Sequence, residues 1–242
     1  MVKPSVADRS ATPEGTRQDG STGFAKIADR YDVITVVLSY GQDRRWKRRL
    51  LHLALPVKGK RALDLATGTG DIAYALHRHG ARVVGLDVTP RMIELALRKS
   101  SPDLAGPAFL IGDMLALPFP SDSFDFVTTG YGLRNVTDLT AAIDEIRRVL
   151  KPGGQLLALD FNRPANRFVR SLYLMYLTAI GGLLGWALHR DPDTYRYIPA
   201  SIRNYPGGPA VAELMGRHGF SLAHYLPVLG GLMAVHHARK QW

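Results

Sequence analysis

The chain has 242 residues, of which 46% are hydrophobic and 21% charged, as in an ordinary globular protein with one substantial domain. It contains no cysteine, which excludes disulfides, thiolate metal sites and cysteine nucleophiles. The net charge of +10 is uneven, because residues 1–60 and 161–242 each carry +6 and residues 61–160 carry −2. Basic flanks suit a nucleic acid, an anionic membrane or an anionic substrate, and a solvated basic surface would have the same composition.

The first 20 residues contain no apolar core and carry three acids. They therefore fit neither a secretory signal nor an organelle transit peptide. We predict a short disordered tail over residues 1–22.

From residue 60 onward, runs with strand character alternate with amphipathic runs of helical period. The predicted elements in chain order are strand 60–66, helix 71–80, strand 81–88, helix 90–100, strands 107–114 and 124–130, helix 139–154, strand 155–161, helix 212–220, and strands 221–227 and 231–238. Pro90 in the first turn of a helix is typical of a helix start. The alternation predicts an α/β fold with a parallel sheet that is covered on both faces.

Residues 171–188 run for 18 residues without a charge, which just reaches the length of a membrane-spanning helix. The segment also contains three glycines, two tyrosines, a serine and a threonine, and it interrupts the α/β pattern. We therefore favour an apolar lid, an interface helix or a membrane-touching element over a spanning helix. Its basic flanks are Arg167, Arg170 and Arg190.

The stretch ALDLATGTGDIAYAL, residues 62–76, joins a predicted strand to a predicted helix through Gly68 and Gly70. With Ala73 these glycines fit the G-x-G-x-x-G/A fingerprint of dinucleotide-binding turns. Glycine permits close backbone approach, which a Cβ would block. The motif alone does not say which nucleotide-like cofactor is bound.

Acids stand at three predicted strand ends, where ligands of open α/β sheets bind: Asp64, Asp87 and Asp113. A carboxylate at Asp87 suits the ribose of either a nicotinamide cofactor or S-adenosylmethionine. Asp64, just before the glycine turn, would repel a pyrophosphate and attract the ammonium and sulfonium groups of S-adenosylmethionine. The sequence therefore favours S-adenosylmethionine.

Four stretches add a more specific indication: RYDVITVVLSYGQDRRWKR (30–48), LDLATGTGD (63–71), GYGLRNVTD (130–138) with RVLKPGG (148–154), and DTYRYIPASIRNYP (193–206). In these stretches the chain resembles the class I S-adenosylmethionine-dependent methyltransferases. Within them it resembles the family that C-methylates ring precursors of menaquinone and ubiquinone. The resemblance covers roughly residues 24–240. GLRNVTD and YRYIPASIR are its most specific parts, since general methyltransferases do not share them.

The resemblance implies a Rossmann-like class I methyltransferase fold, with a seven-stranded, mostly parallel sheet, helices on both faces and a helical lid. After the tail, residues 23–242 would form one methyltransferase domain. Its expected parts are an N-terminal helical cap (23–58), a cofactor-binding core (60–162), a lid or substrate insertion (163–206), and a C-terminal helix and strands (207–242).

The resemblance also implies the residues that bind the cofactor. These are Asp64, Gly68, Thr69 and Gly70 for the methionine part, Asp87 for the ribose, Asp113 and Met114 for the adenine, and the backbone of Gly130 on the methyl-donor side. S-adenosylmethionine would be the methyl donor, with no metal.

Arg134 and Asn135, just beyond the fourth strand, are the catalytic candidates that would steer the quinol oxygen. An arginine there can stabilise a developing phenolate and hold a water that acts as base. A structural role for Arg134, paired with Asp138 or with a carbonyl, is the alternative. Further candidates for closing the substrate pocket are Tyr31, Tyr195, Arg196 and Arg203, for which packing or surface roles also stay open.

A prenylated quinol would account for both the apolar segment 171–188 and the basic flanks. The isoprenoid tail needs an apolar slot, and the enzyme must collect its substrate at an anionic membrane. We expect a cytoplasmic bacterial protein that is peripheral at the inner face of the plasma membrane. A homo-oligomer or a quinone-biosynthesis complex stays open.

The chain departs from the usual pattern of the family at three N-terminal positions, Ile34, Thr35 and Asp43, and again at Gly207 and Gly208. The ring therefore stays open between demethylmenaquinol and the benzoquinol precursor of ubiquinone. Another hydrophobic phenol, a polyketide or a sterol-like substrate is the alternative.

Other classes fit less well. A nicotinamide oxidoreductase would place Asp64 beside a pyrophosphate and leave LRNVTD unexplained. A nucleic-acid methyltransferase would need a cysteine or an Asn/Asp-Pro-Pro-aromatic turn, so no nucleic-acid partner is expected. A module that binds the cofactor without turnover is the non-enzymatic alternative. His77 and His79 on a helix, and His236 and His237 on a strand, point to different sides, so no metal is predicted.

Overall fold

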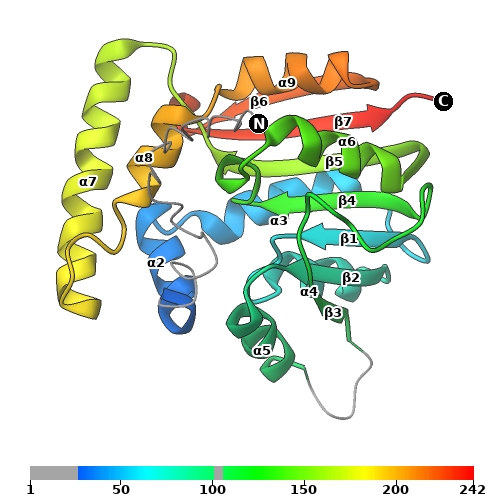
Figure 1. The fold of residues 1–242 in the computed structure, drawn as a ribbon, viewed down its shortest axis with the longest axis horizontal. Helices are drawn as coiled ribbons and strands as arrows, with labels where there is room; N and C mark the ends of the chain where they lie inside the picture. Colours follow the sequence, from blue (N-terminus) through cyan, green and yellow to red (C-terminus); the bar gives the residue numbers. More distant parts are fainter. Residues whose placement is uncertain (1–26, 101–105) are drawn as a thin grey trace, which may run out of the picture.

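The computed structural model describes residues 27–100 and 106–242. The predicted tail, residues 1–22, lies outside this range. Seven strands form one sheet in the order β3-β2-β1-β4-β5-β7-β6 (Figure 1). The strands are β1 (Arg61–Leu65), β2 (Arg82–Asp87), β3 (Ala108–Ile111), β4 (Phe124–Gly130), β5 (Leu150–Phe161), β6 (Phe220–Val228) and β7 (Met233–Lys240).

Neighbouring strands from β3 to β5 pair in parallel, and β7 is antiparallel to both β5 and β6. The expected seven-stranded, mostly parallel sheet is therefore confirmed. The α-helices are α2 (Tyr31–Leu38), α3 (Asp43–Ala54), α4 (Asp71–Arg78), α5 (Pro90–Arg98), α6 (Leu139–Val149), α7 (Arg167–His189), α8 (Tyr197–Asn204) and α9 (Gly208–Arg217). Short 3-10 turns are η1 (Ala28–Arg30), η2 (Leu133–Asn135) and η3 (Leu229–Gly231).

Local chemistry sets several of these boundaries. The Asp138 side chain accepts a hydrogen bond from the Ala141 amide at 3.0 Å and caps α6. Helix α6 ends at Val149, so the predicted helix 139–154 is too long. Pro152 cannot continue a helix, and residues 150–154 begin β5 instead.

The central strands are buried on both faces, because successive apolar side chains point alternately to the two sides of the sheet. In β1, Ala62 packs into a cluster with Ile72 and Leu76 of α4, whereas Leu63 and Leu65 pack into the cluster that contains the inner face of α6. Burial on both sides is typical of parallel strands between two helical layers.

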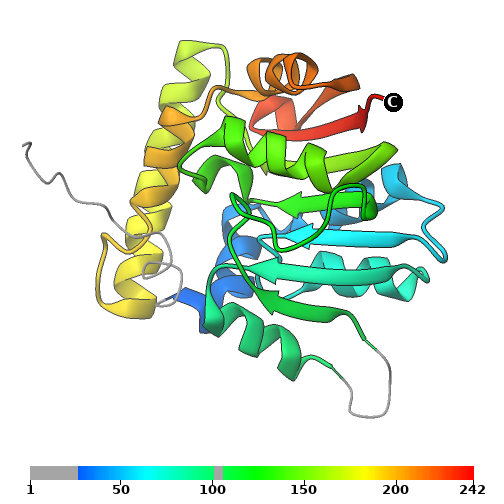
Figure 2. The same cartoon turned by 45° about the vertical axis from the view of Figure 1, so that its right-hand side comes forward.

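The apolar segment 171–188 lies within α7, which stands at the carboxyl ends of β1 and β4 with α8 and α2 between it and the sheet (Figures 1 and 2). In the described part of the chain, α7 is the one helix long and apolar enough to cross a membrane by length and composition. Only 28% of its most apolar stretch is buried. The edge of the sheet where the predicted site lies is thus roofed by three helices.

Candidate cofactor and substrate site

A cavity opens at the carboxyl edge of the sheet. The turn after β1 supplies Gly68, the end of β2 supplies Asp87, and the end of β4 supplies Gly130. The chain after β3 adds Asp113 and Met114. The sequence predicted a cofactor contact at each of these positions, and the structure brings them to one space.

Asp87 connects the ends of β1 and β2. Its Oδ2 accepts a hydrogen bond from the Gly68 amide, and its Oδ1 accepts one from the Thr89 amide, both at 2.9 Å. Burial raises the pKa of Asp87, and the two amides oppose this rise. Each carboxylate oxygen keeps a second lone pair. Asp87 can therefore fix the glycine turn and still accept the hydroxyls of a ribose.

Asp64 and Thr69 line a second cavity, which shares Tyr31, Gly68 and Gly130 with the first. Two predicted groups of cofactor residues thus meet along a common wall formed by the glycine turn and the end of β4. The two spaces therefore adjoin at the glycine turn.

Asp64 is only 1% exposed, and both of its oxygens are occupied. Oδ2 accepts a hydrogen bond from Thr67 Oγ1 at 2.6 Å, and Oδ1 accepts one from Thr128 Oγ1 at 2.7 Å. Burial raises the pKa of Asp64 to about 6, although the two hydroxyls and Lys47 lower it. A buried carboxylate of this kind favours a cation beside it, and the role that the sequence predicted for Asp64 stays a prediction.

Gly70 differs from the other predicted cofactor residues. It precedes α4 with φ +84°, and a Cβ at this position would come within 2.9 Å of the Phe109 ring and 3.1 Å of the Tyr74 ring. This φ lies in the left-handed region that glycine tolerates best. Gly70 therefore serves the turn and the close packing of α4, facing Phe109 and Tyr74 instead of either cavity.

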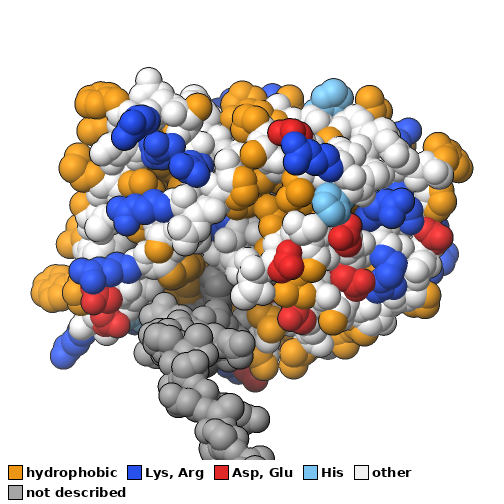
Figure 3. All heavy atoms as spheres, turned by 45° about the horizontal axis from the view of Figure 1, so that its top comes forward, with side chains coloured by type: hydrophobic (Ala, Val, Ile, Leu, Met, Phe, Trp, Pro, Cys, Tyr) orange, Lys and Arg blue, Asp and Glu red, His pale blue; other side chains and the backbone are white. Residues whose placement is uncertain are grey.

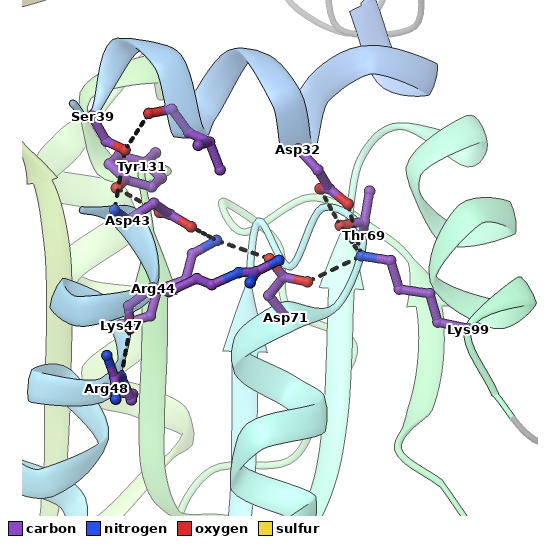
Figure 4. A network of polar contacts seen from close by, with 11 residues as sticks. Asp32, Ser39, Asp43, Arg44, Lys47, Arg48, Thr69, Asp71, Lys99 and Tyr131 are labelled. Carbon is purple, nitrogen blue, oxygen red and sulfur yellow. Dashed lines mark hydrogen bonds and ion pairs between the residues drawn. The ribbon is translucent and has the colours of Figure 1, made fainter. Parts of the chain in front are cut away.

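Alternating charges tie the N-terminal helices to the glycine turn (Figure 4). Lys47 of α3 lies between Asp43 at 2.8 Å and Asp71 at 3.1 Å. Lys99, just after α5, lies between Asp71 at 3.0 Å and Asp32 of α2 at 2.9 Å. We refer to these five side chains as the charged clasp. It links α2, α3 and α5 through Asp71, the first residue of α4 after the glycine turn.

Both ends of the charged clasp continue into the cavities. Tyr131, directly after β4, donates its hydroxyl to Asp43 at 2.8 Å, and Thr69 donates to Asp32 at 2.7 Å (Figure 4). Tyr131 lines both cavities and Thr69 lines the second. The clasp therefore fixes two walls of the site.

Arg134 lies on η2 with a side chain that is 3% exposed. Its Nε is 3.5 Å from Asp160 Oδ1 and makes no hydrogen bond within the described ranges. Its Nη1 donates to the Tyr131 carbonyl at 3.3 Å, and its guanidinium lies 4.9 Å from the centre of the Phe161 ring. For the alternative, structural role of Arg134, the sequence offered Asp138 or a carbonyl as partner. Asp138 instead caps α6, whereas the Tyr131 carbonyl is such a partner.

Asp160 holds Arg134 from the end of β5. Its Oδ2 accepts the Arg134 backbone amide at 3.1 Å, and its Oδ1 accepts the Phe161 amide at 2.8 Å. Burial raises the pKa of Asp160, and the Arg134 guanidinium lowers it only in part. The other catalytic candidate, Asn135, donates Nδ2 to the Tyr131 carbonyl at 2.9 Å and lines the first cavity.

Four tyrosines lie within the electrostatic reach of Arg134: Tyr31, Tyr173, Tyr197 and Tyr205. Burial raises the pKa of each hydroxyl, and the positive charge of Arg134 opposes that rise. Since these hydroxyls stay protonated, they are hydrogen-bond donors in an apolar space. Tyr31 belongs to this group and also lines both cavities.

The structure places the other three substrate candidates away from these cavities. Tyr195 is buried beside α7, and its hydroxyl lies 2.8 Å from His189 Nε2. Arg196 is exposed and pairs with Asp193 at 2.9 Å. Arg203 lines a separate hollow between α7 and α8. Among these candidates, only Tyr31 stands at the site.

The two histidines of β7 have different partners. His236 is buried with Nε2 at 2.9 Å from the Gly208 carbonyl, and His237 pairs with Gln155 at 2.7 Å. Among the residues that the structure describes, no group of three or more His, Cys, Asp or Glu could hold a metal ion.

Sequence reasoning missed Asp160 and the charged clasp. Asp160 stands near the end of a predicted strand, as Asp64 and Asp87 do, so the strand-end argument could have found it. Asp43 and Lys47 are four residues apart on one helix face, a spacing that predicts an ion pair. The contact of Lys47 with Asp71 had no such local signal.

Comparison with known proteins identifies relatives of the whole chain. The model of the ubiE/COQ5 methyltransferase family matches residues 16–240. The demethylmenaquinone methyltransferase of Thermus thermophilus is 41% identical over 88% of this chain and 97% of its own. The ubiquinone/menaquinone biosynthesis C-methyltransferase UbiE of Shewanella frigidimarina is 36% identical over 90% of this chain and 88% of its own.

Solved structures share the fold at lower identity. A possible histamine N-methyltransferase from Thermotoga maritima, described as S-adenosylmethionine-dependent, has a TM-score of 0.66 at 20% identity and covers 91% of this chain and 99% of its own. Phosphoethanolamine N-methyltransferase 2 of Haemonchus contortus, solved with S-adenosylmethionine, has a TM-score of 0.63 at 16% identity and covers 84% of this chain and 53% of its own.

Proposed function

Because this chain belongs to the ubiE/COQ5 methyltransferase family, we propose that it methylates a ring carbon of a prenylated quinol. S-adenosylmethionine is the methyl donor, and the reaction belongs to respiratory quinone biosynthesis. The observation that carries the proposal is the likeness to the Thermus thermophilus demethylmenaquinone methyltransferase, which extends over 97% of that protein. Demethylmenaquinol is thus the first substrate to test, and the benzoquinol precursor of ubiquinone is the second.

The residues at the carboxyl edge fit S-adenosylmethionine. Asp87 would accept the ribose hydroxyls, Asp64 would lie near the positive methionine end, and Met114 would pack on the adenine. At Gly130 a Cβ would come within 2.8 Å of Ile72, so the end of β4 offers the ligand its bare backbone. When bound, S-adenosylmethionine supplies a methyl group on a sulfonium, which is already a strong electrophile.

On the acceptor side, the chain must make a ring carbon nucleophilic. Loss of a phenolic proton does so, and the negative charge that develops on the ring oxygen needs donors. Arg134 and Asn135 are our candidates for this task, and Tyr31 would donate its hydroxyl beside them. Asn135 lines the first cavity, and the buried guanidinium of Arg134 belongs to the same short turn η2, where its positive charge supports the assignment.

Much of the rate would come from holding the ring carbon in line with the methyl group. The roof of α2, α7 and α8 would exclude bulk water from the reacting groups. We further propose that the enzyme is cytoplasmic and collects its prenylated substrate at an anionic membrane surface. The α7 helix supports this, since its length and composition suit contact with lipid.

Methyl transfer from isotopically labelled S-adenosylmethionine tests the proposal. Reduced, short-tailed demethylmenaquinol should gain a labelled methyl group on a ring carbon, read by mass spectrometry, and the oxidised quinone should gain none. A parallel reaction with the reduced benzoquinol precursor would identify the preferred ring. If the cofactor binds and neither quinol is methylated, the proposal fails, and other hydrophobic phenols become the substrates to screen.

A further inference from the structure

The outer face of α7 carries an apolar stripe. Its members recur at intervals of three, four or eight residues and are between 46% and 71% exposed: Phe168, Leu172, Met175, Leu183 and Trp186. These intervals place them along one side of a helix with 3.6 residues per turn. The stripe therefore extends over most of a helix about 34 Å long.

The opposite face of α7 is anchored to the body of the protein. Tyr176 stacks on Tyr40 of the segment after α2, with ring centres 5.2 Å apart. The Tyr173 hydroxyl donates to the Leu232 carbonyl at 3.3 Å, and Arg30 Nη1 donates to the Leu188 carbonyl at 2.8 Å. A spanning position would break these contacts. The helix therefore exposes one apolar side to solvent while its other side packs against the body of the protein.

Three arginines surround a hollow at the start of α7: Arg167 and Arg170 on α7, and Arg203 on α8. None of them pairs with a carboxylate in the described parts of the chain, and no Asp or Glu occurs between residues 161 and 190. Figure 3 shows Lys and Arg side chains in a row over the side where α7 and α8 lie, with hydrophobic side chains along its edge. Cations near a helix start oppose its macrodipole, so Arg167 and Arg170 do not serve helix stability.

We propose that this face is a docking surface for an anionic lipid bilayer, in which α7 lies flat. The stripe would sink among the upper acyl chains while Arg167, Arg170 and Arg203 bind lipid phosphates. An apolar stripe with a basic rim is the composition that interfacial helices use. The charges favour this occupant over a second copy of the chain, because a symmetric contact through α7 would bring together two basic helices that carry no Asp or Glu to pair with the arginines.

The inference rests on the proposed function for its cargo, a prenylated quinol drawn from the bilayer. Helix α2 packs against α7 and begins with Tyr31, which lines both cavities of the site. The docked stripe would therefore lie one helix away from the cofactor, within reach of an isoprenoid tail that stays partly in the membrane.

Flotation with vesicles of phosphatidylcholine, with or without an equal part of phosphatidylglycerol, tests the surface on the full chain. The wild type should float with the anionic vesicles and much less with the neutral ones. The variant Phe168→Ser/Met175→Ser/Trp186→Ser should bind more weakly by on the order of tenfold for each side chain replaced. The variant Arg167→Gln/Arg170→Gln/Arg203→Gln should lose about fivefold for each charge, and only at low salt.

Matched controls change the same chemistry elsewhere. The side chains of Leu97 and Leu222 are 52% and 63% exposed outside α7, and Leu97→Ser/Leu222→Ser should bind as the wild type does. Arg78, Arg82 and Arg98 are exposed and outside every ion pair of the described residues, so Arg78→Gln/Arg82→Gln/Arg98→Gln should have a much smaller effect than the α7 triple. Equal losses in the two arginine triples would overturn the proposal and leave only a response to net charge.

Tryptophan fluorescence reads the orientation directly. Trp46 is buried and Trp186 is 66% exposed, so the variant Trp242→Phe leaves one buried and one exposed indole. Lipids brominated on the acyl chain should quench Trp186 and spare Trp46. An unquenched Trp186 would contradict a docked α7. A second result would also contradict the proposal: the stripe variant is a monomer where the wild type is a dimer, and flotation is unchanged. The apolar face would then join two copies of the chain.

The two proposals can fail separately. Short-tailed quinol should be methylated in solution without vesicles, and the docking variants should keep the wild-type rate there. Flotation without methylation of either quinol would contradict the proposed function and leave the docking surface supported. Methylation without flotation would contradict the docking surface and leave the proposed function supported.

Discussion

At the cofactor edge, each lysine of the charged clasp is held between carboxylates: Lys47 between Asp43 and Asp71, and Lys99 between Asp71 and Asp32. Along α7 the pattern is reversed. Arg167 and Arg170 line a hollow next to exposed apolar side chains, with no carboxylate partner among the described residues. The two regions meet at the roof over the carboxyl edge of the sheet, which contains α7 and which the clasp joins through Asp32 of α2.

The difference separates two uses of charge. Paired groups with several hydrogen bonds fix the relative positions of backbone segments, here α2, α3 and the glycine turn. Unpaired cations on an apolar rim leave their charge free for a partner. The buried pair of Arg134 and Asp160 belongs to neither pattern, because it lies in the core and keeps one guanidinium nitrogen without a hydrogen bond.

The largest effect is expected at this buried pair. Arg134→Met should reduce kcat by roughly a thousandfold, because it removes the donor for the developing phenolate. It should also lower the free energy of unfolding by about 3–5 kcal/mol, since Asp160 is left as an unpaired buried charge. Quinol methylation at saturating cofactor and chemical denaturation measure the two effects.

The variant Arg134→Met/Asp160→Leu separates stability from catalysis. Without an unpaired carboxylate it should recover most of the lost stability and none of the lost activity. Recovery of both would show that Arg134 has a structural role only.

The next effect concerns Asp64. Its folded pKa lies at about 6, above the ordinary 3.8, so the folded chain holds a proton that the unfolded chain releases between these values. Stability therefore falls as the pH rises through this window, and above it the ionised carboxylate costs about 3 kcal/mol. At pH 7, Asp64→Asn should stabilise the cofactor-free protein and bind S-adenosylmethionine at least tenfold more weakly. Thermal melts and calorimetric titration measure both; equal cofactor affinity would remove Asp64 from the site.

The same pKa predicts a pH-dependent affinity. As the pH falls below about 6, wild-type Asp64 becomes neutral and loses its attraction for the positive methionine end. The dissociation constant of S-adenosylmethionine should then rise by at most tenfold per pH unit. The Asp64→Asn variant should lack this dependence, and an unchanged slope in it would assign the effect to another group.

A smaller effect distinguishes Gly70 of the glycine turn from Gly216 of α9. Gly70→Ala should destabilise the protein by about 2 kcal/mol, because φ +84° and the approach to Phe109 both oppose a Cβ. Gly216, near the end of α9, has open space around it, so Gly216→Ala should stabilise by up to about 1 kcal/mol. Urea denaturation measures both. If Gly70→Ala instead weakened cofactor binding with no loss of stability, its assignment to packing would be wrong.

The smallest effect is expected at the outer end of the charged clasp. Lys99 is 37% exposed and its partner Asp32 is 49% exposed, so Lys99→Met should cost at most about 1 kcal/mol. Lys47 is 16% exposed and contacts the buried Asp43, so Lys47→Met should cost more. Both losses are measured as free energies of unfolding by urea denaturation. Equal losses would show that the buried ion pairs of the clasp contribute no more stability than the exposed ones.

Much of the site was accessible from the sequence because strand-end positions carry it. Asp64, Asp87, Asp113 and Gly130 follow hydrophobic runs of strand length, and parallel strands bring such ends to one edge. The glycine motif did not predict that Gly70 serves packing and not the cofactor. Its neighbour Phe109 comes from β3, which is distant in the sequence. Tyr195 and Arg196 share a specific motif with Arg203, yet the path of the chain between α7 and α8 carries all three away from the cavities.

The sequence by itself determined the order of strands and helices, the glycine turn and the acids at its rim, because hydrophobic period and turn chemistry act over a few residues. Tertiary structure alone decided that Asp160 holds Arg134, that Asp71 joins Lys47 to Lys99, and that α7 shows one apolar side to solvent. Those outcomes depend on which distant segments pack together and which side of a helix they bury, and no local pattern encodes that choice.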